Sequence, residues 1–256
     1  MVSIHNLVIA RRHNHCVAKI VTVASAKGGV GKSTIAYELA HLLEAPLVDL
    51  DWEDGSSTVA WGYDQKYRST TPMLRTAFAE DRIPRPISGR NKPDLVPCYK
   101  NFVNEQPPAD DIRDALEKWA GEWGRPYVVV DTHPGGCPST FGAMAAASVI
   151  VTPVLLGVRE LAALQGWLEE LGDYPFLVIP NRLARGIPKA WSLRRLSEIV
   201  REAGGVPVGP PISEYSWLRD RQRRMALTAA PEGSGVRVRK VAADMEAVAE
   251  AVRTYG

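Results

Sequence analysis

The sequence predicts an α/β fold in which a doubly wound, mostly parallel sheet carries helices on both faces. Short apolar runs that suit buried strands alternate with segments whose apolar residues recur at helical spacing. Several of these runs are continuously apolar, which is typical of parallel strands that are covered on both sides. The chain has 256 residues, 45% hydrophobic and 23% charged, so it can bury the core that such a fold requires.

The first half of the chain begins with a strand, a turn and a helix. Residues 19–26 are rich in β-branched side chains and predict the first strand, and residues 32–43 carry apolar side chains at helical spacing. A glycine turn separates the two. A short strand that ends in carboxylates is expected at 46–51, and a weaker one at 94–98. Residues 56–110 have the least regular pattern.

The second half of the chain continues the alternation. Its cleanest strand is Tyr127-Val-Val-Val-Asp131, which is apolar until its final carboxylate. Further strands are expected at 149–154 and 175–180. Helices are expected at 111–123, 159–171 and 193–203. Because helices lie between the strands, we expect both faces of the sheet to be covered.

The last segment of the chain predicts an amphipathic helix. Its apolar residues follow a spacing of 4, 3 and 4, which forms one helix face: Val241, Met245, Val248 and Val252. The polar face carries acidic residues rather than an excess of lysine and arginine: Asp244, Glu246 and Glu250. We interpret the segment as a terminal helix that packs on the sheet, with a membrane-surface helix as the alternative.

The organisation of the chain indicates one domain, 1–256, with residues 1–18 as an N-terminal extension. An early arginine pair and a partly apolar stretch resemble a signal peptide, but Lys19 interrupts the stretch, and cleavage after Ala26 would remove the first strand. The three cysteines lack metal-ligand spacing, and no run of 18 apolar residues occurs. We therefore expect a cytoplasmic protein without a membrane span.

The glycine turn after the first strand has the pattern of a phosphate-binding loop, and it lies between a strand and a helix as that motif requires. Gly28, Gly29 and Gly31 permit backbone conformations that turn successive N–H groups toward phosphate. Lys32 supplies a charge to the β and γ phosphates, and the Ser33 hydroxyl can ligate Mg²⁺. The residues expected to hold the nucleotide here are Gly28, Gly29, Val30, Gly31, Lys32, Ser33 and Thr34.

Two predicted strands end in carboxylates. Asp131 ends the strand 127–131, where open α/β sheets place their ligands, and it can hold the water shell of Mg²⁺. Asp51 ends the strand 46–51, which also carries Asp49. The alternative for Asp51 is a strand-end aspartate that caps a turn.

The segment Lys27-Gly-Gly-Val-Gly-Lys-Ser-Thr34 resembles the deviant Walker A box of the ParA/MinD superfamily. The general phosphate loop begins with glycine, whereas this one has Ala26, followed by a second lysine, Lys27. In this family the first lysine reaches across an ATP-sandwich dimer, so the resemblance implies that role for Lys27; the alternative is an exposed loop lysine. The resemblance further implies a P-loop NTPase fold, ATP and Mg²⁺ as cofactors, and hydrolysis of ATP to ADP and phosphate.

The same resemblance implies roles for the carboxylates. Val48-Asp-Leu-Asp51 resembles the second acidic motif, in which Asp51 would help to position the attacking water beside the Mg²⁺ site and Asp49 would support it; Asp131 would be the Walker B carboxylate. The expected metal-binding residues are Ser33, Asp51 and Asp131, and the expected catalytic residues are Lys27, Lys32 and Asp51. The family's partition members commonly have Pro-Gln-Gly after the second acidic motif, whereas this chain has Trp52-Glu-Asp-Gly55.

Three further segments resemble parts of the family's nucleotide site. Thr132-His-Pro-Gly-Gly136 resembles the loop that senses the γ-phosphate, with His133 where many relatives have proline. We interpret His133 as a local substitution rather than a catalytic residue. Asn181 matches the asparagine that contacts adenine, whose edge an amide can pair with. Pro211 is expected to pack near the base.

Basic charge is concentrated in residues 182–224. The chain as a whole carries 31 basic and 29 acidic residues, a net charge of +2, whereas this segment holds ten against four, or +6. Such a segment can neutralise DNA phosphates without reading bases, although a solvated helix face is the alternative. The first candidates for DNA contact are Arg219, Arg221, Arg223 and Arg224, followed by Arg194 and Arg195.

The resemblance implies a partition switch of the short ParA type as the preferred function. ATP would close a homodimer, the dimer would bind duplex DNA non-specifically on the nucleoid, and a ParB-like centromere-binding partner would stimulate hydrolysis and release. The alternative is a MinD-like ATPase that acts on a membrane or a protein scaffold; a membrane partner is not expected. A reductase or metal carrier would need paired cysteines, and an amidoligase relative would not ordinarily carry Lys27.

Overall fold

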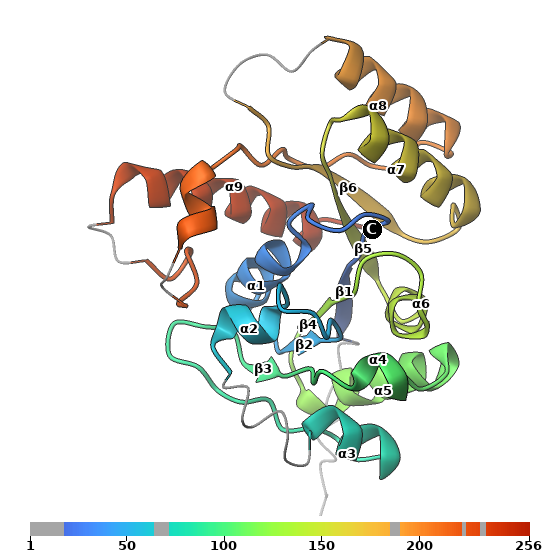
Figure 1. Cartoon of the computed structure of the whole chain (residues 1–256), viewed down its shortest axis with the longest axis vertical. Coiled ribbons are helices and arrows are strands. Elements are labelled where there is room, and N and C mark those ends of the chain that lie inside the picture. Colours follow the sequence, from blue (N-terminus) through green and yellow to red (C-terminus); the bar gives the residue numbers. More distant parts are fainter. Residues whose placement is uncertain (1–17, 64–71, 185–189, 222–223, 231–233) are drawn as a thin grey trace, which may run out of the picture.

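The computed structural model describes residues 18–63, 72–184, 190–221, 224–230 and 234–256, without the side chains of residues 219 and 220. Apart from Ala18, the predicted extension 1–18 lies outside these residues. Within them, a six-stranded parallel sheet has the order β3-β2-β4-β1-β5-β6 (Figure 1). The strands are Lys19–Val23 (β1), Leu47–Asp49 (β2), Leu95–Val96 (β3), Tyr127–Asp131 (β4), Val149–Val154 (β5) and Phe176–Pro180 (β6).

Helices cover both faces of this sheet, which confirms the predicted fold class (Figure 1). One face is covered by α1 (Lys32–Leu42) and α9 (Val236–Arg253). The other face is covered by α5 (Ala109–Trp123), α6 (Pro138–Ala145), α7 (Val158–Glu170) and α8 (Ala190–Glu202). The shorter helices are α2 (Ser57–Trp61), α3 (Met73–Ala79), α4 (Phe102–Glu105) and the 3₁₀ helix η2 (Ser216–Asp220).

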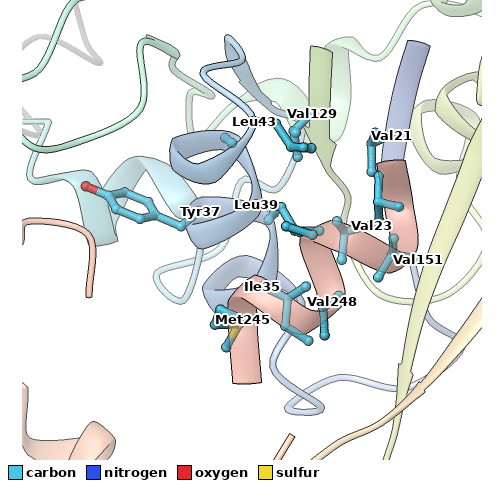
Figure 2. Close-up of a cluster of buried hydrophobic side chains, with 14 of the residues drawn as sticks. Val21, Val23, Ile35, Tyr37, Leu39, Leu43, Val129, Val151, Met245 and Val248 are labelled. Atoms are coloured by element: carbon cyan, nitrogen blue, oxygen red, sulfur yellow. The ribbon is translucent and has the colours of Figure 1, made fainter. Parts of the chain in front are cut away.

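The core follows the two-residue period of the strands. Val21 and Val23 of β1 pack under α1 and α9, as Figure 2 shows, whereas Ile20 belongs to the cluster that packs on α5 and α6. All three side chains are buried. Because both sides of each strand are buried, a continuously apolar run was the right signal for these strands.

The terminal helix packs as predicted. Val241, Met245, Val248 and Val252 are buried in the same cluster as α1, and Figure 2 shows Met245 and Val248 facing that helix. Burial of side chains of this size contributes about 1.5–3 kcal/mol each. The interpretation as a helix that packs in the fold is therefore confirmed. Among the helices that the structure describes, none combines the length and the hydrophobicity that crossing a membrane requires.

The predicted element boundaries agree with the structure in the regular regions and fail in the irregular ones. Strands 127–131 and 149–154 match β4 and β5, and the strand predicted at 19–26 ends at Val23 because the chain turns there into the glycine loop. Among the helices that the structure describes, four α-helices, α2, α3, α4 and α6, and the 3₁₀ helix η2 were not predicted. The helices α2, α3 and α4 lie within the region of weak pattern, and α6 is a short helix of mostly small residues that begins with Pro138.

Candidate functional site

Parallel pairing brings the predicted site residues to one edge of the sheet. In the register of the sheet, Val23 of β1 lies beside Asp131 of β4, and Asp131 lies beside Asp49 of β2. The glycine loop follows β1, Asp51 lies two residues beyond β2, and Asn181 directly follows β6. All of these residues therefore lie at the carboxyl ends of the strands, where open α/β sheets bind ligands.

The glycine loop requires glycine at two of its positions. Gly29 and Gly31 have φ values of 73° and 97°, a region that side chains disfavour. A Cβ on Gly31 would also lie 2.5 Å from Nδ2 of Asn181. At Gly28, by contrast, a Cβ would meet Pro134 at an ordinary 3.7 Å, so no contact within the described protein requires glycine there. The loop leads into the N-terminus of α1, whose free N–H groups suit a phosphate.

The two lysines of the loop lie in opposite environments. Lys32 is only 6% exposed, and burial lowers its pKa, although the nearby charges of Asp131, Asp51 and Glu53 act in the other direction. Lys27 is exposed. The structure thus places one cation inside the site and the other on the surface of the same loop, where a second molecule can reach it.

Asp131 has the surroundings of a metal-binding carboxylate. Its side chain is fully buried, and burial raises its pKa to about 6. Oδ2 accepts hydrogen bonds from the Ser57 hydroxyl at 2.7 Å and the Ser57 N–H at 3.3 Å, and the nearby Ser33 side chain acts to lower the pKa. Within the described part of the chain, Oδ1 is buried without a hydrogen-bond partner. A hydroxyl beside a carboxylate with one unpaired oxygen fits Mg²⁺, which prefers oxygen ligands.

Asp49 supports the site rather than facing the ligand. Its Oδ2 accepts hydrogen bonds from the backbone N–H and the hydroxyl of Thr58, at 2.6 and 2.5 Å, and Oδ1 accepts one from the Asp51 N–H. Burial, together with the charge of Asp131, raises its pKa. These contacts tie the start of α2 to the end of β2 and so fix the path of the chain around Asp51.

Asp51 lies where two loops meet. It is 5% exposed, burial raises its pKa, and its Oδ1 accepts a 3.1 Å hydrogen bond from the Glu53 N–H. The His133 ring stacks on Trp52 with centroids 4.1 Å apart and planes 9° apart, and its Nε2 lies 3.3 Å from Oε1 of Glu53. The loop after β2 and the loop after β4 therefore contact each other through side chains.

The loop at 132–136 also contacts the glycine loop. The Gly135 N–H donates to the Ser25 carbonyl at 3.0 Å, and the Thr132 hydroxyl donates to the Val23 carbonyl at 3.0 Å. The Ser25 hydroxyl in turn donates to the Lys27 carbonyl. A shift in the loop that resembles the γ-phosphate sensor would therefore be transmitted directly to the segment that carries Lys27.

Asn181 supports the glycine loop and borders a pocket. Its Nδ2 donates to the Val30 carbonyl at 2.6 Å, and its Oδ1 accepts from the Arg182 N–H at 2.8 Å. An amide has a second N–H and a second lone pair, which remain available for a base. The pocket is lined by Gly31, Thr34 and Asn181, together with residues 212–215. Pro211 does not line it: this residue is exposed, and Ile212 contacts the pocket instead.

The predicted DNA-binding arginines whose side chains the structure describes do not form one exposed patch. Arg221 faces inward, where Nη1 lies 3.6 Å from Oε1 of the buried Glu38 and Nη2 donates to the Met225 carbonyl, so the structure pairs this candidate within the fold. Arg195 bonds to Glu198, one turn along α8, and to Gln165 on the neighbouring helix α7. Arg194 and Arg224 are exposed. Arg223 and the side chain of Arg219 lie outside the described residues.

Two polar contacts of the site were missed by the sequence analysis. Ser57 bonds to Asp131, and its helix begins after the run Asp54-Gly-Ser-Ser57, which is a helix-start signal that we could have used. Glu38 accepts hydrogen bonds from the Leu227 and Thr228 N–H groups at 2.8 and 3.0 Å. No local pattern could reveal this second contact, because its partners are far apart in the sequence.

Comparisons with known sequences agree on one family. A family model described as ParA, NUBPL iron-transfer P-loop NTPase, matches residues 16–54. The chromosome partitioning protein ParA of Myxococcus xanthus is 30% identical over 165 residues, which cover 59% of this chain and 56% of that protein. A putative septum site-determining protein MinD of Guillardia theta is 25% identical over 203 residues, 75% of this chain and 74% of that protein. The match thus spans little more than half the length of the ParA relative.

Solved structures share the whole fold. An ATP complex of a McdA variant from Cyanothece has a TM-score of 0.74 at 19% identity and covers 93% of this chain and 97% of that chain. MinD of Pyrococcus horikoshii OT3, solved with Mg-ADP, has a TM-score of 0.69 at 19% identity and covers 93% and 96%. With the glycine loop and the buried carboxylates in place, the chain is similar in sequence to ParA, Soj and MinD proteins, and its fold is that of P-loop NTPases of the ParA/MinD type.

Proposed function

We propose that the protein is an ATPase switch that dimerises around ATP and binds DNA in that state. The observation that carries this proposal is the pair of lysines on one phosphate loop, Lys32 buried against the carboxylates and Lys27 exposed. A single lysine is enough to neutralise phosphates within one subunit. A second, exposed lysine on the same loop is most useful against a nucleotide held by another copy of the chain.

The proposed reaction is hydrolysis of ATP to ADP and phosphate. The N–H groups of the glycine loop and the Lys32 ammonium would hold the phosphates, and the pocket beside Asn181 would hold the base. Ser33 and Asp131 would hold Mg²⁺, which neutralises charge that develops on the phosphates. Asp51 would accept a hydrogen bond from the attacking water and so orient it, a role that its burial at the end of β2 supports.

We expect the variant Lys27→Ala to bind ATP but to fail to dimerise with it. Within one subunit, Lys32 already supplies the charge that the phosphates need. Loss of the exposed Lys27 side chain should therefore weaken the dimer interface more than it weakens binding of ATP to the monomer. Nucleotide titration gives the affinity of the monomer, and size-exclusion chromatography with light scattering, with ADP and with a slowly hydrolysed ATP analogue, gives the oligomeric state.

A mixed dimer separates action across the interface from action within one subunit. Lys27→Ala subunits are combined with subunits that carry Asp51→Ala, and turnover is measured for the mixture. If Lys27 acts in trans, the nucleotide held by the Lys27→Ala subunit still meets an intact lysine from its partner, so turnover is partly restored. A mixture that stays as inactive as each variant alone would contradict the trans assignment.

DNA binding is the second half of the proposal. The segment 182–224 carries a net charge of +6, and two of its predicted contact residues, Arg194 on α8 and Arg224 after η2, are exposed. Relatives include the partitioning proteins ParA of Myxococcus xanthus and Soj of Thermus thermophilus. On this proposal the ATP dimer associates with the nucleoid in the cytoplasm, and a ParB-like partner stimulates hydrolysis and release.

Binding of duplex DNA is expected to require the ATP state and to fall steeply with salt. If about three cations per subunit contact phosphates, a dimer makes roughly six contacts with DNA. The logarithm of the association constant should then fall with the logarithm of the salt concentration, with a slope of about −5. The substitutions Arg194→Glu and Arg224→Glu should each weaken binding to two unrelated duplexes alike, while ATP-dependent dimerisation persists. Fluorescence anisotropy in both nucleotide states measures these effects.

The matched control is Arg125→Glu. Arg125 is also exposed, but it directly precedes β4 and therefore lies at the edge of the sheet opposite the nucleotide site. Reversal of the charge at position 125 should leave the affinity for DNA within about twofold of that of the parent protein. Equal binding with ADP and with the ATP analogue, or none in either state at low salt, would remove DNA from the mechanism.

The alternative is a MinD-like ATPase that acts on a scaffold. The sequence match with MinD of Guillardia theta favours it, because that match covers 75% of this chain. The packing of α9 counts against use of this helix at a membrane, because its apolar face is buried against α1. A metal carrier is disfavoured by the described cysteines, since Cys98 is buried and Cys137 contacts Ser139 and Thr140. Failure of DNA binding would promote the scaffold function.

A further inference from the structure

We propose that Asp51, Glu53 and His133 form a binding site for a divalent transition-metal ion of the Zn²⁺ class, which shares only Asp51 with the predicted Mg²⁺ site at Ser33, Asp51 and Asp131. The potential ligand atoms of the three side chains all lie within 4.8 Å of one another. Two carboxylates and one imidazole are a donor set that suits Zn²⁺, whereas Mg²⁺ prefers oxygen ligands alone. This site goes beyond the proposed ATPase function.

The spacing of two ligands already fits a tetrahedral ion. With metal–ligand distances of about 2.0–2.2 Å, two ligand atoms of a tetrahedral site lie roughly 3.3–3.6 Å apart. Nε2 of His133 and Oε1 of Glu53 are 3.3 Å apart, which is long for a hydrogen bond but correct for two atoms that share such an ion. Glu53 is exposed, so its side chain can adjust to close the remaining distance to Asp51.

The surroundings hold the ligands in place. The His133 ring is stacked on Trp52 at 4.1 Å between centroids, which fixes its plane. Asp51 is 5% exposed, and the described contacts give its carboxylate one hydrogen bond, from the Glu53 N–H to Oδ1. Oδ2 is therefore available as the buried ligand. Preorganised ligands lose less entropy when the ion binds.

A bound ion would strengthen the contact between two loops that already meet through the His133 ring, Trp52 and Glu53. Asp51 and Glu53 lie on the loop after β2, whereas His133 lies on the loop after β4. An ion that binds all three residues would hold the loops together and occupy the Asp51 carboxylate. The expected inhibition of turnover rests on the proposed function, but binding of the ion does not.

Isothermal titration of the nucleotide-free, full-length chain with Zn²⁺ tests the site in the presence of excess Mg²⁺. The sequence offers other potential ligands, among them His13, His15 and Cys16, so the informative quantity is the difference between matched variants. We expect His133→Asn and Glu53→Gln each to remove one equivalent of Zn²⁺, or to weaken it at least about tenfold. The exposed neighbour Asp54 gives the control, Asp54→Asn, which should bind as the parent does.

Fluorescence locates the ion. Co²⁺ bound to His133 lies next to the Trp52 indole and should quench it in a saturable way. Trp52→Phe keeps an aromatic ring against His133, so it should retain the Zn²⁺ stoichiometry but lose this quenching. Circular dichroism establishes that each variant is folded. The proposal is overturned if either His133→Asn or Glu53→Gln binds Zn²⁺ as the parent does, or if the quenching persists without Trp52.

Discussion

Replacement of Lys32 by alanine is expected to weaken ATP binding by roughly 100-fold or more. The ammonium is buried among carboxylates, and the phosphates of a nucleotide would bring further negative charge to the same place. Loss of charge-assisted hydrogen bonds costs about 1.5–3 kcal/mol, and the unbalanced charge of Asp131 and Asp51 adds to that cost. Titration with a fluorescent ATP analogue measures the change in Kd.

The loop supplies its own matched control for this experiment. Lys27 lies five residues away on the same loop and is exposed, so Lys27→Ala should leave the nucleotide affinity of the monomer nearly unchanged. Lys32→Arg is a further test, because the larger planar guanidinium does not fit a buried position that was built for a compact ammonium. An unchanged Kd for Lys32→Ala would show that the buried lysine does not contact the nucleotide.

The strands and their carboxylates could be predicted because the relevant signals are local. A parallel strand with both faces buried reads as an unbroken apolar run, and the polar residue that ends it marks the edge where ligands bind. Asp131 and Asp51 were identified in this way, and the structure brings both to the edge that follows the glycine loop. The positive φ of Gly31 likewise follows from the turn that the motif requires.

The basic segment shows what a sequence pattern cannot reveal. The sequence shows how many arginines the segment contains but not where their side chains point. The side chain of Arg221 points toward Glu38, which lies on α1, far earlier in the chain. The stack of His133 on Trp52 depends in the same way on two loops that only the parallel pairing of β2 and β4 brings together. Contacts between segments that are distant in the sequence thus determine which of the predicted residues lie at the candidate site and which are paired elsewhere.

Replacement of Asp51 by alanine is expected to abolish turnover while ATP binding and ATP-dependent dimerisation persist. Its carboxylate is proposed to orient the attacking water, and that contact matters in the transition state more than in the bound ground state. A positioned carboxylate that handles a reacting water typically contributes about 10²- to 10⁴-fold to the rate. Steady-state ATPase assays give the loss of rate, and ATP-dependent sizing by light scattering tests whether the dimer still forms.

Two further variants decide between the catalytic and the structural explanation of such a loss. Asp51→Asn keeps the shape of the side chain and can still accept the Glu53 N–H through its amide oxygen, so the loop should keep its path while the negative charge is lost. Turnover as low as in Asp51→Ala would therefore assign the effect to the carboxylate itself. Asp49, whose contacts tie α2 to β2, gives the contrast, because Asp49→Asn should lower the melting temperature. Full turnover in Asp51→Ala would contradict the role of this residue in hydrolysis, and a loss of ATP binding in Asp51→Asn would reassign it to the ground-state site.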